Sequence, residues 1–132
     1  MEKQYDERIL AVDDEKSVCE VLRSVLSRRG YNVKSVTTGP LALTEIPTYR
    51  PHLVLLDLRM PGMDGFETLR RIKQLWNDLP VIVLTGVTDT ETARRAMEQG
   101  AVDYIAKPFD NEQLLTNVRV HCLMNISGDP VN

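Results

Sequence analysis

The sequence has few of the features that mark membrane, secreted or nucleic-acid-binding proteins. No apolar run in its 132 residues approaches the roughly 20 residues that span a bilayer. The first eight residues, Met-Glu-Lys-Gln-Tyr-Asp-Glu-Arg, lack the apolar core of a signal peptide. Positive charge is not in excess, because the formal net charge is -3. Bulk electrostatics therefore favour neither nucleic acid nor a membrane as a partner, and we expect a cytoplasmic protein.

Cysteine is scarce as well. The two cysteines, Cys19 and Cys122, lack the spacing of metal ligands and fall within segments of helical pattern. We expect both thiols to act as small, buried or half-buried hydrophobes. The chain is long enough for one hydrophobic core but too short for two ordinary domains. One domain is predicted over residues 5–124, and residues 125–132 are typical of a tail or the start of a linker.

Short apolar runs alternate with segments of helical period along the domain. The runs predict strands at about residues 8–12, 31–36, 52–56, 81–84 and 102–106, each followed by a helix. The second helix is expected to be short, over residues 41–46, and to end at Pro47. Asp64 and Asp110 are expected to cap the third and fifth helices. This alternation predicts a parallel sheet with helices on both faces.

Polar residues stand where four of these strands end. Asp13 and Asp14 follow the first strand, Asp57 ends the third, Thr85 follows the fourth and Lys107 follows the fifth. A single acid there could simply be a residue that leaves a strand for a loop. The carboxyl ends of parallel strands, however, lie at one edge of a sheet, which is where open α/β sheets place their chemistry. We therefore expect three carboxylates, a hydroxyl and an amine to converge.

The order and spacing of these residues resemble the receiver domain of two-component response regulators. The resemblance extends over about Arg8 to Met124 and includes Asp13-Asp14, Asp57, the loop Met60-Pro61-Gly62-Met63-Asp64-Gly65, Thr85-Gly86, and Tyr104 with Lys107-Pro108-Phe109. It implies an α/β, flavodoxin-like (CheY-like) five-stranded parallel sheet of order 2-1-3-4-5 with five helices on both faces. The switch point of such a sheet lies between strands one and three. The resemblance also implies a cis peptide bond before Pro108.

The three acids predict a metal site. Three neighbouring carboxylates repel one another, and a hard divalent cation relieves that repulsion. Mg²⁺ (or Mn²⁺) prefers oxygen ligands and typically takes one or two carboxylates together with phosphate oxygens. Asp14 and Asp57 are the expected direct ligands, and Asp13 is expected to act through water. The resemblance adds the backbone carbonyl of Arg59.

Asp57 is the predicted nucleophile, which accepts a phosphoryl group as an acyl phosphate. The cation and Lys107 would neutralise charge on the phosphoryl oxygens, and Thr85 would donate a hydrogen bond to one of them. The resemblance implies that a histidine kinase or phosphotransfer protein is the donor. It also implies that Thr85 and Tyr104 switch the face formed by the fourth helix, fifth strand and fifth helix. The domain would assist its own phosphorylation and hydrolysis, and no enzymatic action on external substrates is expected.

Arg59 and Val87 stand two residues past Asp57 and Thr85 respectively. In receivers, variation at these positions is associated with different rates of phosphate loss. Arg59 is long enough to lie over the phosphoryl group, and Val87 offers no hydrogen bond to orient a water molecule. We expect both residues to slow hydrolysis, unless their side chains simply face solvent.

Two other classes of function lack a required feature. An aspartyl phosphatase of the haloacid dehalogenase type needs an acid two residues after its nucleophile, where Arg59 stands. A nucleotide-binding module needs a glycine-rich loop after the first strand, where Asp13-Asp14-Glu15-Lys16 would repel phosphate. A receiver-like module that works by contact without phosphorylation stays open. So do an ordinary strand role for Thr85, a core role for Tyr104, and the output, which is a domain beyond Asn132 or a separate effector protein.

Overall fold

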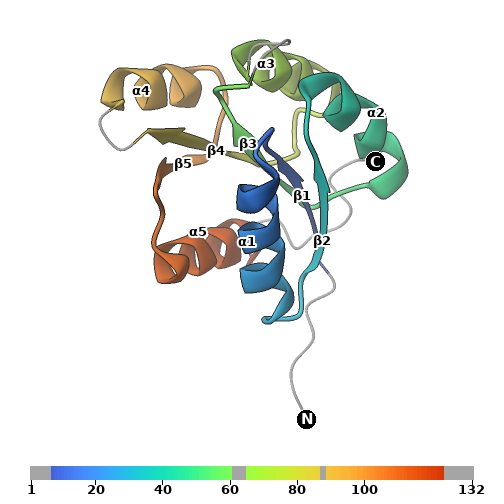
Figure 1. Ribbon diagram of the computed structural model, residues 1–132. Helices are drawn as coiled ribbons and strands as arrows, with labels where there is room; N and C mark the ends of the chain where they lie inside the picture. Colours follow the sequence, from blue (N-terminus) through green and yellow to red (C-terminus); the bar gives the residue numbers. More distant parts are fainter. Residues whose placement is uncertain (1–6, 61–64, 87–88, 124–132) are drawn as a thin grey trace.

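A computed structural model describes residues 7–60, 65–86 and 89–123, which form a parallel sheet with helices on both faces (Figure 1). The strands are β1 (Arg8–Val12), β2 (Asn32–Val36), β3 (Leu53–Asp57), β4 (Val81–Gly86) and β5 (Asp103–Lys107). The helices are α1 (Lys16–Ser27), α2 (Gly39–Tyr49), α3 (Gly65–Leu75), α4 (Thr90–Glu98) and α5 (Asn111–Leu123). The strand order is β2-β1-β3-β4-β5, and every pairing is parallel. The predicted α/β sheet of order 2-1-3-4-5 is therefore confirmed.

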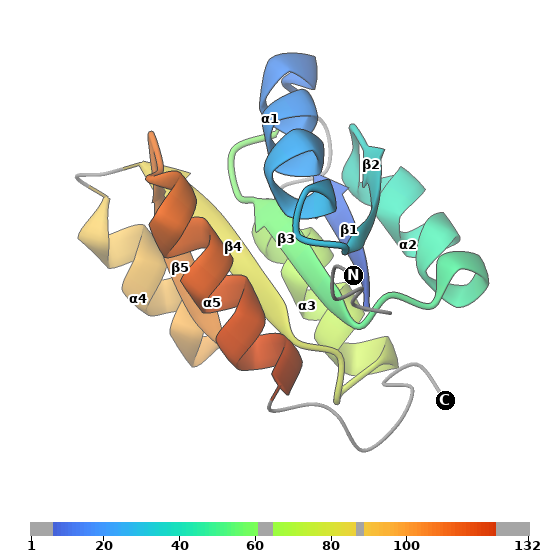
Figure 2. The same cartoon turned by 90° about the horizontal axis from the view of Figure 1, so that it is seen from below.

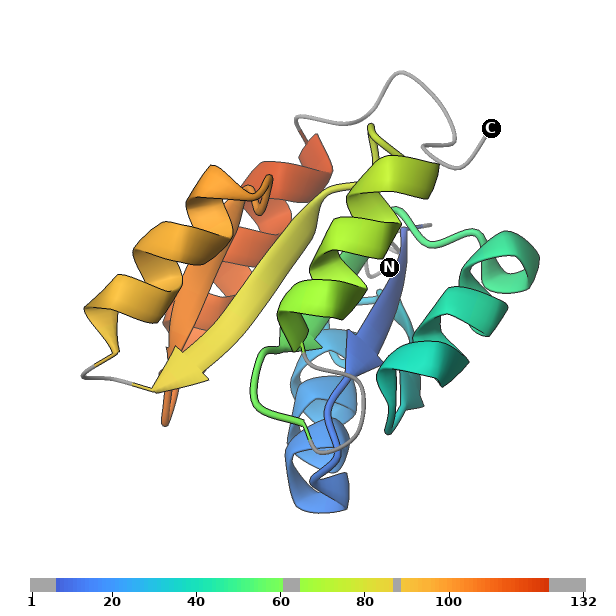
Figure 3. The same ribbon diagram turned by 90° about the horizontal axis from the view of Figure 1, so that it is seen from above.

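The sheet separates two hydrophobic cores. Helices α1 and α5 cover one face (Figure 2), and α2, α3 and α4 cover the other (Figure 3). The central strand β3 contributes to both, because successive side chains of a strand point to opposite faces. Leu53 and Leu55 pack into the core under α1 and α5, whereas Val54 and Leu56 pack into the core under α2 and α3. Burial on both faces explains why this strand is a continuous apolar run in the sequence.

Helix α2 does not end at Pro47, so that prediction was wrong. Pro47 lies inside the helix, which continues to Tyr49 and ends where Arg50 adopts a left-handed φ of 55°. Proline removes one helical hydrogen bond, but contacts from elsewhere in the chain hold the last turn. The Tyr49 hydroxyl donates to the Asn32 carbonyl at 3.0 Å, and Arg8 Nε donates to the carbonyls of Tyr49 and Arg50.

The helical stripes are buried at their centres and exposed at their flanks. Both cysteines are buried and free, as predicted. In α1, Leu22 and Leu26 are fully buried, but the neighbouring Val21 is 44% exposed. Leu75 of α3 is likewise exposed. A residue next to a buried position is rotated about 100° from it around the helix axis, which explains why Val21, next to Leu22, leaves the core.

Two further predictions concern helix caps and membrane association. Asp110 caps α5, because its Oδ1 accepts a hydrogen bond from the Glu112 amide at 3.1 Å. The predicted cap at Asp64 lies outside the described residues, as does the predicted tail at 125–132. Within the described ranges, no helix combines the length and apolar character needed to cross a bilayer. The cytoplasmic location stays a prediction.

Candidate functional site

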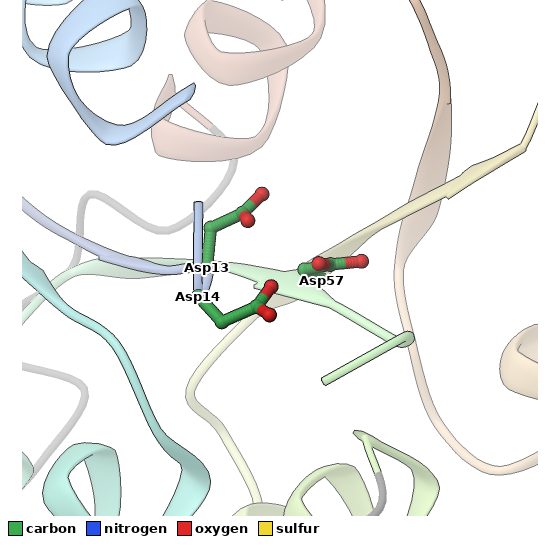
Figure 4. Close-up of side chains that lie close together, drawn as sticks. All are labelled: Asp13, Asp14 and Asp57. Atoms are coloured by element: carbon green, nitrogen blue, oxygen red, sulfur yellow. The ribbon is translucent and has the colours of Figure 1, made fainter. Parts of the chain in front are cut away.

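Three carboxylates meet at the carboxyl ends of β1 and β3. Val12 of β1 pairs with Leu56 of β3, so the residues that follow them, Asp13 and Asp57, are neighbours across the sheet. Asp14 comes next in the chain, and oxygen atoms of the three side chains lie within 4.8 Å of one another (Figure 4). Asp13 and Asp57 are buried, with exposed fractions of 0% and 4%. The predicted convergence at the switch point of the sheet is present in the structure.

Each of the two buried acids is held by a backbone amide two residues further along the chain. Asp13 Oδ1 accepts from the Glu15 amide at 3.0 Å, and Asp57 Oδ1 accepts from the Arg59 amide at 3.0 Å. This local pairing is typical of aspartate in turns. It fixes the orientation of both carboxylates and leaves their Oδ2 atoms for other partners.

Lys107 lies against those Oδ2 atoms. Its Nζ is 2.8 Å from Asp13 Oδ2 and 3.5 Å from Asp57 Oδ2. A third carboxylate, Glu15, lies 3.5 Å from the same nitrogen and was not predicted as part of the site. The peptide bond between Lys107 and Pro108 is cis, as the resemblance implied. The amine from the end of β5 thus joins acids from β1 and β3.

The site carries more negative than positive charge. The pKa of Asp57 is raised to about 6, mainly by burial and also by the Asp13 carboxylate, although the Arg59 amide and Lys107 act to lower it. The pKa of Lys107 is raised, because hydrogen bonding and charge from Asp13, Asp57 and Glu15 outweigh its burial. The three aspartates and one lysine carry a formal charge of -3 + 1 = -2 when ionised. A divalent cation would neutralise that charge, and oxygen donors suit a hard ion.

Thr85 lies in the adjoining part of the sheet, near the end of β4. Its neighbour Leu84 pairs with Asp57, and Thr85 itself pairs with Ala106 of β5. The side chain is 3% exposed, and its hydroxyl oxygen has no hydrogen-bond partner among the described residues. Leaving such a group unsatisfied typically costs about 1–3 kcal/mol. An ordinary strand role does not account for this hydroxyl, whereas an incoming oxygen-rich group would supply its partner.

The other predicted residues differ in where they lie. Tyr104 of β5 is 44% exposed, which argues against a plain core role. The Arg59 side chain pairs with an acid outside the cluster, because its Nη2 donates to Asp89 Oδ2 at 2.8 Å. The expectation that Arg59 lies over a phosphoryl group and slows its hydrolysis stays a prediction. Val87 lies outside the described residues, and the role of the Arg59 carbonyl as a metal ligand stays a prediction.

Comparison with known proteins explains this arrangement. A family model described as the response regulator receiver domain matches residues 9–119. The chain belongs to this family.

Its relatives include the DNA-binding response regulator MtrA of Mycolicibacterium paratuberculosis, which is 40% identical over 90% of this chain and 52% of its own length. The response regulator MprA of Mycobacterium leprae is 41% identical over 85% of this chain and 49% of its own. The chain therefore spans about half the length of these relatives. The crystal structure of a putative response regulator from Chloroflexus aurantiacus superposes with a TM-score of 0.86 at 34% identity, covering 90% of this chain and 99% of that one.

The receiver family explains why the acids and the lysine lie at one edge of the sheet. The chain is a receiver domain of the two-component type, and a phosphoacceptor role fits its site. Members of this family are generally not enzymes. The alternatives of a receiver-like contact module that works without phosphorylation and of an aspartyl phosphatase are not favoured.

Proposed function

We propose that Asp57 is the phosphoacceptor and that a histidine kinase or a phosphotransfer protein supplies the phosphoryl group. The observation that carries this proposal is the convergence at Asp57. Its buried carboxylate lies 3.5 Å from the Lys107 ammonium and within a cluster of three acids. A pKa of about 6 leaves Asp57 mostly ionised at pH 7, as a nucleophile requires.

The transfer step follows from these groups. One Asp57 oxygen attacks the phosphorus of a phosphohistidine and forms a P–O bond while the P–N bond breaks. The electron pair of the P–N bond stays on the imidazole nitrogen, which takes up a proton. Lys107 stabilises the negative oxygens of the transferring group, because its ammonium is already fixed beside Asp57. Thr85 donates its hydroxyl hydrogen to one of those oxygens and so gains a partner, which no described residue of the chain supplies.

The acid cluster fits Mg²⁺ (or Mn²⁺). Asp14 and Asp57 are the proposed direct ligands, Asp13 acts through water, and the Arg59 carbonyl completes the protein ligands. The oxygen-only donor set and the -2 charge of the cluster support this assignment. When bound, the cation supplies charge neutralisation for phosphoryl transfer.

Phosphorylation would then bias the domain between two conformations. The phosphoryl group draws Thr85 inward, and the exposed Tyr104 ring turns into the space beside it. The face formed by α4, β5 and α5 changes shape as a result. An output domain C-terminal of Asn132 or a separate effector protein would sense this change. The domain assists only its own phosphorylation and dephosphorylation.

Intact-mass measurement tests the proposal. Wild type incubated with acetyl phosphate and Mg²⁺ should gain one phosphoryl adduct, and Asp57→Asn should gain none. Asp78→Asn is the matched control, because it removes an exposed carboxylate outside the cluster and should leave labelling unchanged. An adduct that persists in Asp57→Asn would refute Asp57 as the acceptor. An adduct that forms equally well in chelator would refute the metal site.

A further inference from the structure

Arg59 connects the turn at residues 57–59 to the start of α4. Its backbone amide donates to Asp57 Oδ1, while its side chain donates to Asp89 Oδ2 at 2.8 Å. Between these two ends it passes Gly86, the residue after Thr85. A Cβ atom on Gly86 would lie 3.8 Å from Arg59 Nη2. The arginine therefore crosses the end of β4 beside the proposed phosphorylation site.

Asp89 has two tasks, one for each oxygen. Its Oδ1 accepts from the Thr92 amide at 3.3 Å and caps α4, while its Oδ2 holds Arg59. The pair is accessible to solvent, with side-chain exposures of 69% for Arg59 and 22% for Asp89. Exposed ion pairs of this kind contribute only about 0–1 kcal/mol. The Arg59–Asp89 ion pair is thus weak enough for a stronger anion nearby to replace Asp89 as the partner of the guanidinium.

A phosphoryl group on Asp57 would be such an anion. It carries a charge of about -1.5 to -2 and three acceptor oxygens. The planar guanidinium matches phosphate oxygens with two parallel hydrogen bonds, which a single exposed carboxylate oxygen does not offer. Because the Arg59 backbone is already fixed to Asp57, the side chain needs only a change of rotamers to reach the phosphoryl group.

We infer that phosphorylation of Asp57 transfers the Arg59 guanidinium from Asp89 to the phosphoryl group. This inference rests on the proposed function and adds Asp89 as a positioning residue. In the unphosphorylated state Asp89 holds the Arg59 side chain close to Asp57 and so connects α4 to the turn at residues 57–59. In the phosphorylated state Arg59 covers the phosphoryl group and shields it from water, and α4 loses that connection. Asp89 and the phosphoryl group compete for one guanidinium, so each weakens the hold of the other.

The structure shows why loss of this connection matters for α4. Ala93 and Ala96 are the buried residues of the helix, so little apolar area holds it to the sheet. Arg95 stacks on the ring of Phe66 of α3, with 4.0 Å between its guanidinium carbon and the ring centre. Loss of the Arg59 contact would leave this stacking at the middle of α4 while its first turn becomes free to shift.

The rate of phosphate loss from Asp57 tests whether the Arg59 guanidinium moves from Asp89 to the phosphoryl group. Asp89→Asn keeps an acceptor oxygen for the helix cap but removes the charge that holds Arg59. It should slow phosphate loss about threefold at saturating Mg²⁺, a size expected for release of an exposed ion pair. Arg59→Gln should accelerate loss by about the same factor. In the Arg59→Gln background, Asp89→Asn should have no further effect.

The control is Glu91→Gln, which removes another carboxylate from the first turn of α4. Glu91 pairs with Arg94 of its own helix and has no ion pair with Arg59 among the described residues, so phosphate loss should be unchanged. Asp89→Ser provides a second capping variant without charge and should behave as Asp89→Asn does.

Three results would overturn the inference. Wild-type rates in Asp89→Asn would show that Asp89 does not compete for Arg59. Equal slowing with and without Arg59 would show that Asp89 acts through the helix cap instead. In both cases Asp57 would still be labelled and the proposed function would stand. Absence of any adduct on Asp57 in wild type would refute both proposals.

Discussion

Helices α1 and α4 cover the same sheet in very different ways. Helix α1 buries Leu22 and Leu26 completely and has Cys19 beside them. Helix α4 buries only alanines, and its Arg94 pairs with Glu91 and Glu98 on its own surface. Burial of a leucine side chain contributes about 1.5–3 kcal/mol to stability, and each buried methylene contributes about 0.8 kcal/mol. Helix α1 is therefore held to the sheet much more firmly than α4.

The strands beside these helices differ in the same direction. The four residues of β1 from Ile9 to Val12 are fully buried, whereas Ile105 is the buried residue of β5. We call β1, β3 and α1 the rigid half of the domain, and β5 and α4 the movable half. Asp13, Asp14 and Asp57 follow or end strands of the rigid half, and Tyr104 lies in the movable half. Acids that must hold fixed positions thus stand on rigid elements, and the parts proposed to move are those with little buried area.

Truncation of a buried leucine should show the largest difference between the two halves. Leu22→Ala in α1 should lower the free energy of unfolding by about 2–5 kcal/mol, because it opens a cavity in the core. Ala96→Gly in α4 should lower it by about 1 kcal/mol, mainly through the helix propensity of glycine. Urea unfolding measures both. Equal losses would show that α4 is held as firmly as α1.

A smaller effect is expected at Asp57. The pKa of this buried acid is raised from its ordinary value of 3.8 to about 6, so the fold favours its protonated form. The resulting penalty on stability is absent below about pH 4, grows between about pH 4 and 6, and is complete above about pH 6. At pH 7 without divalent cations, Asp57→Asn should therefore be more stable than wild type by about 1–3 kcal/mol.

Thermal melts of both proteins across that pH range measure this effect. The difference between them should shrink towards pH 4 and also when Mg²⁺ is added at pH 7, because the cation favours the ionised form. Asp78→Asn should show no such dependence. A difference that is constant with pH would mean that Asp57 is not destabilised by its burial.

The smallest free-energy change should appear in amide hydrogen exchange. A phosphoryl mimic bound at Asp57 should change exchange in Thr90–Glu98 by a factor of about five, or about 1 kcal/mol, with less change in Lys16–Ser27. The reason is the small buried area of α4 and the loss of its contact with Arg59. Equal changes in the two helices would contradict the contrast between the rigid and the movable half.

The sequence was most informative where the chain is buried on both faces. The apolar run before Asp57 predicts a central strand, and the order of parallel strands then brings the acids and Lys107 together. Local pattern failed at Pro47, because contacts from β1 and β2 hold the turn that proline weakens. It also gave no sign of the Arg59–Asp89 pair, since a contact between side chains 30 residues apart leaves no periodic pattern in the sequence.

The parallel arrangement also decides where foreign groups can be attached. Strand β1 begins at Arg8 at the edge of the sheet opposite Asp13, and α5 runs back from the Lys107 edge to Leu123 (Figure 1). The described chain thus starts and finishes on the side away from the acids. The Arg8 contacts with Tyr49 and Arg50 anchor that side to α2. An affinity tag or a linkage to a sensor surface, attached before Glu7 or after Leu123, would start on the side away from the acids. The acid cluster would then stay accessible to a phosphodonor in an assay on immobilised protein.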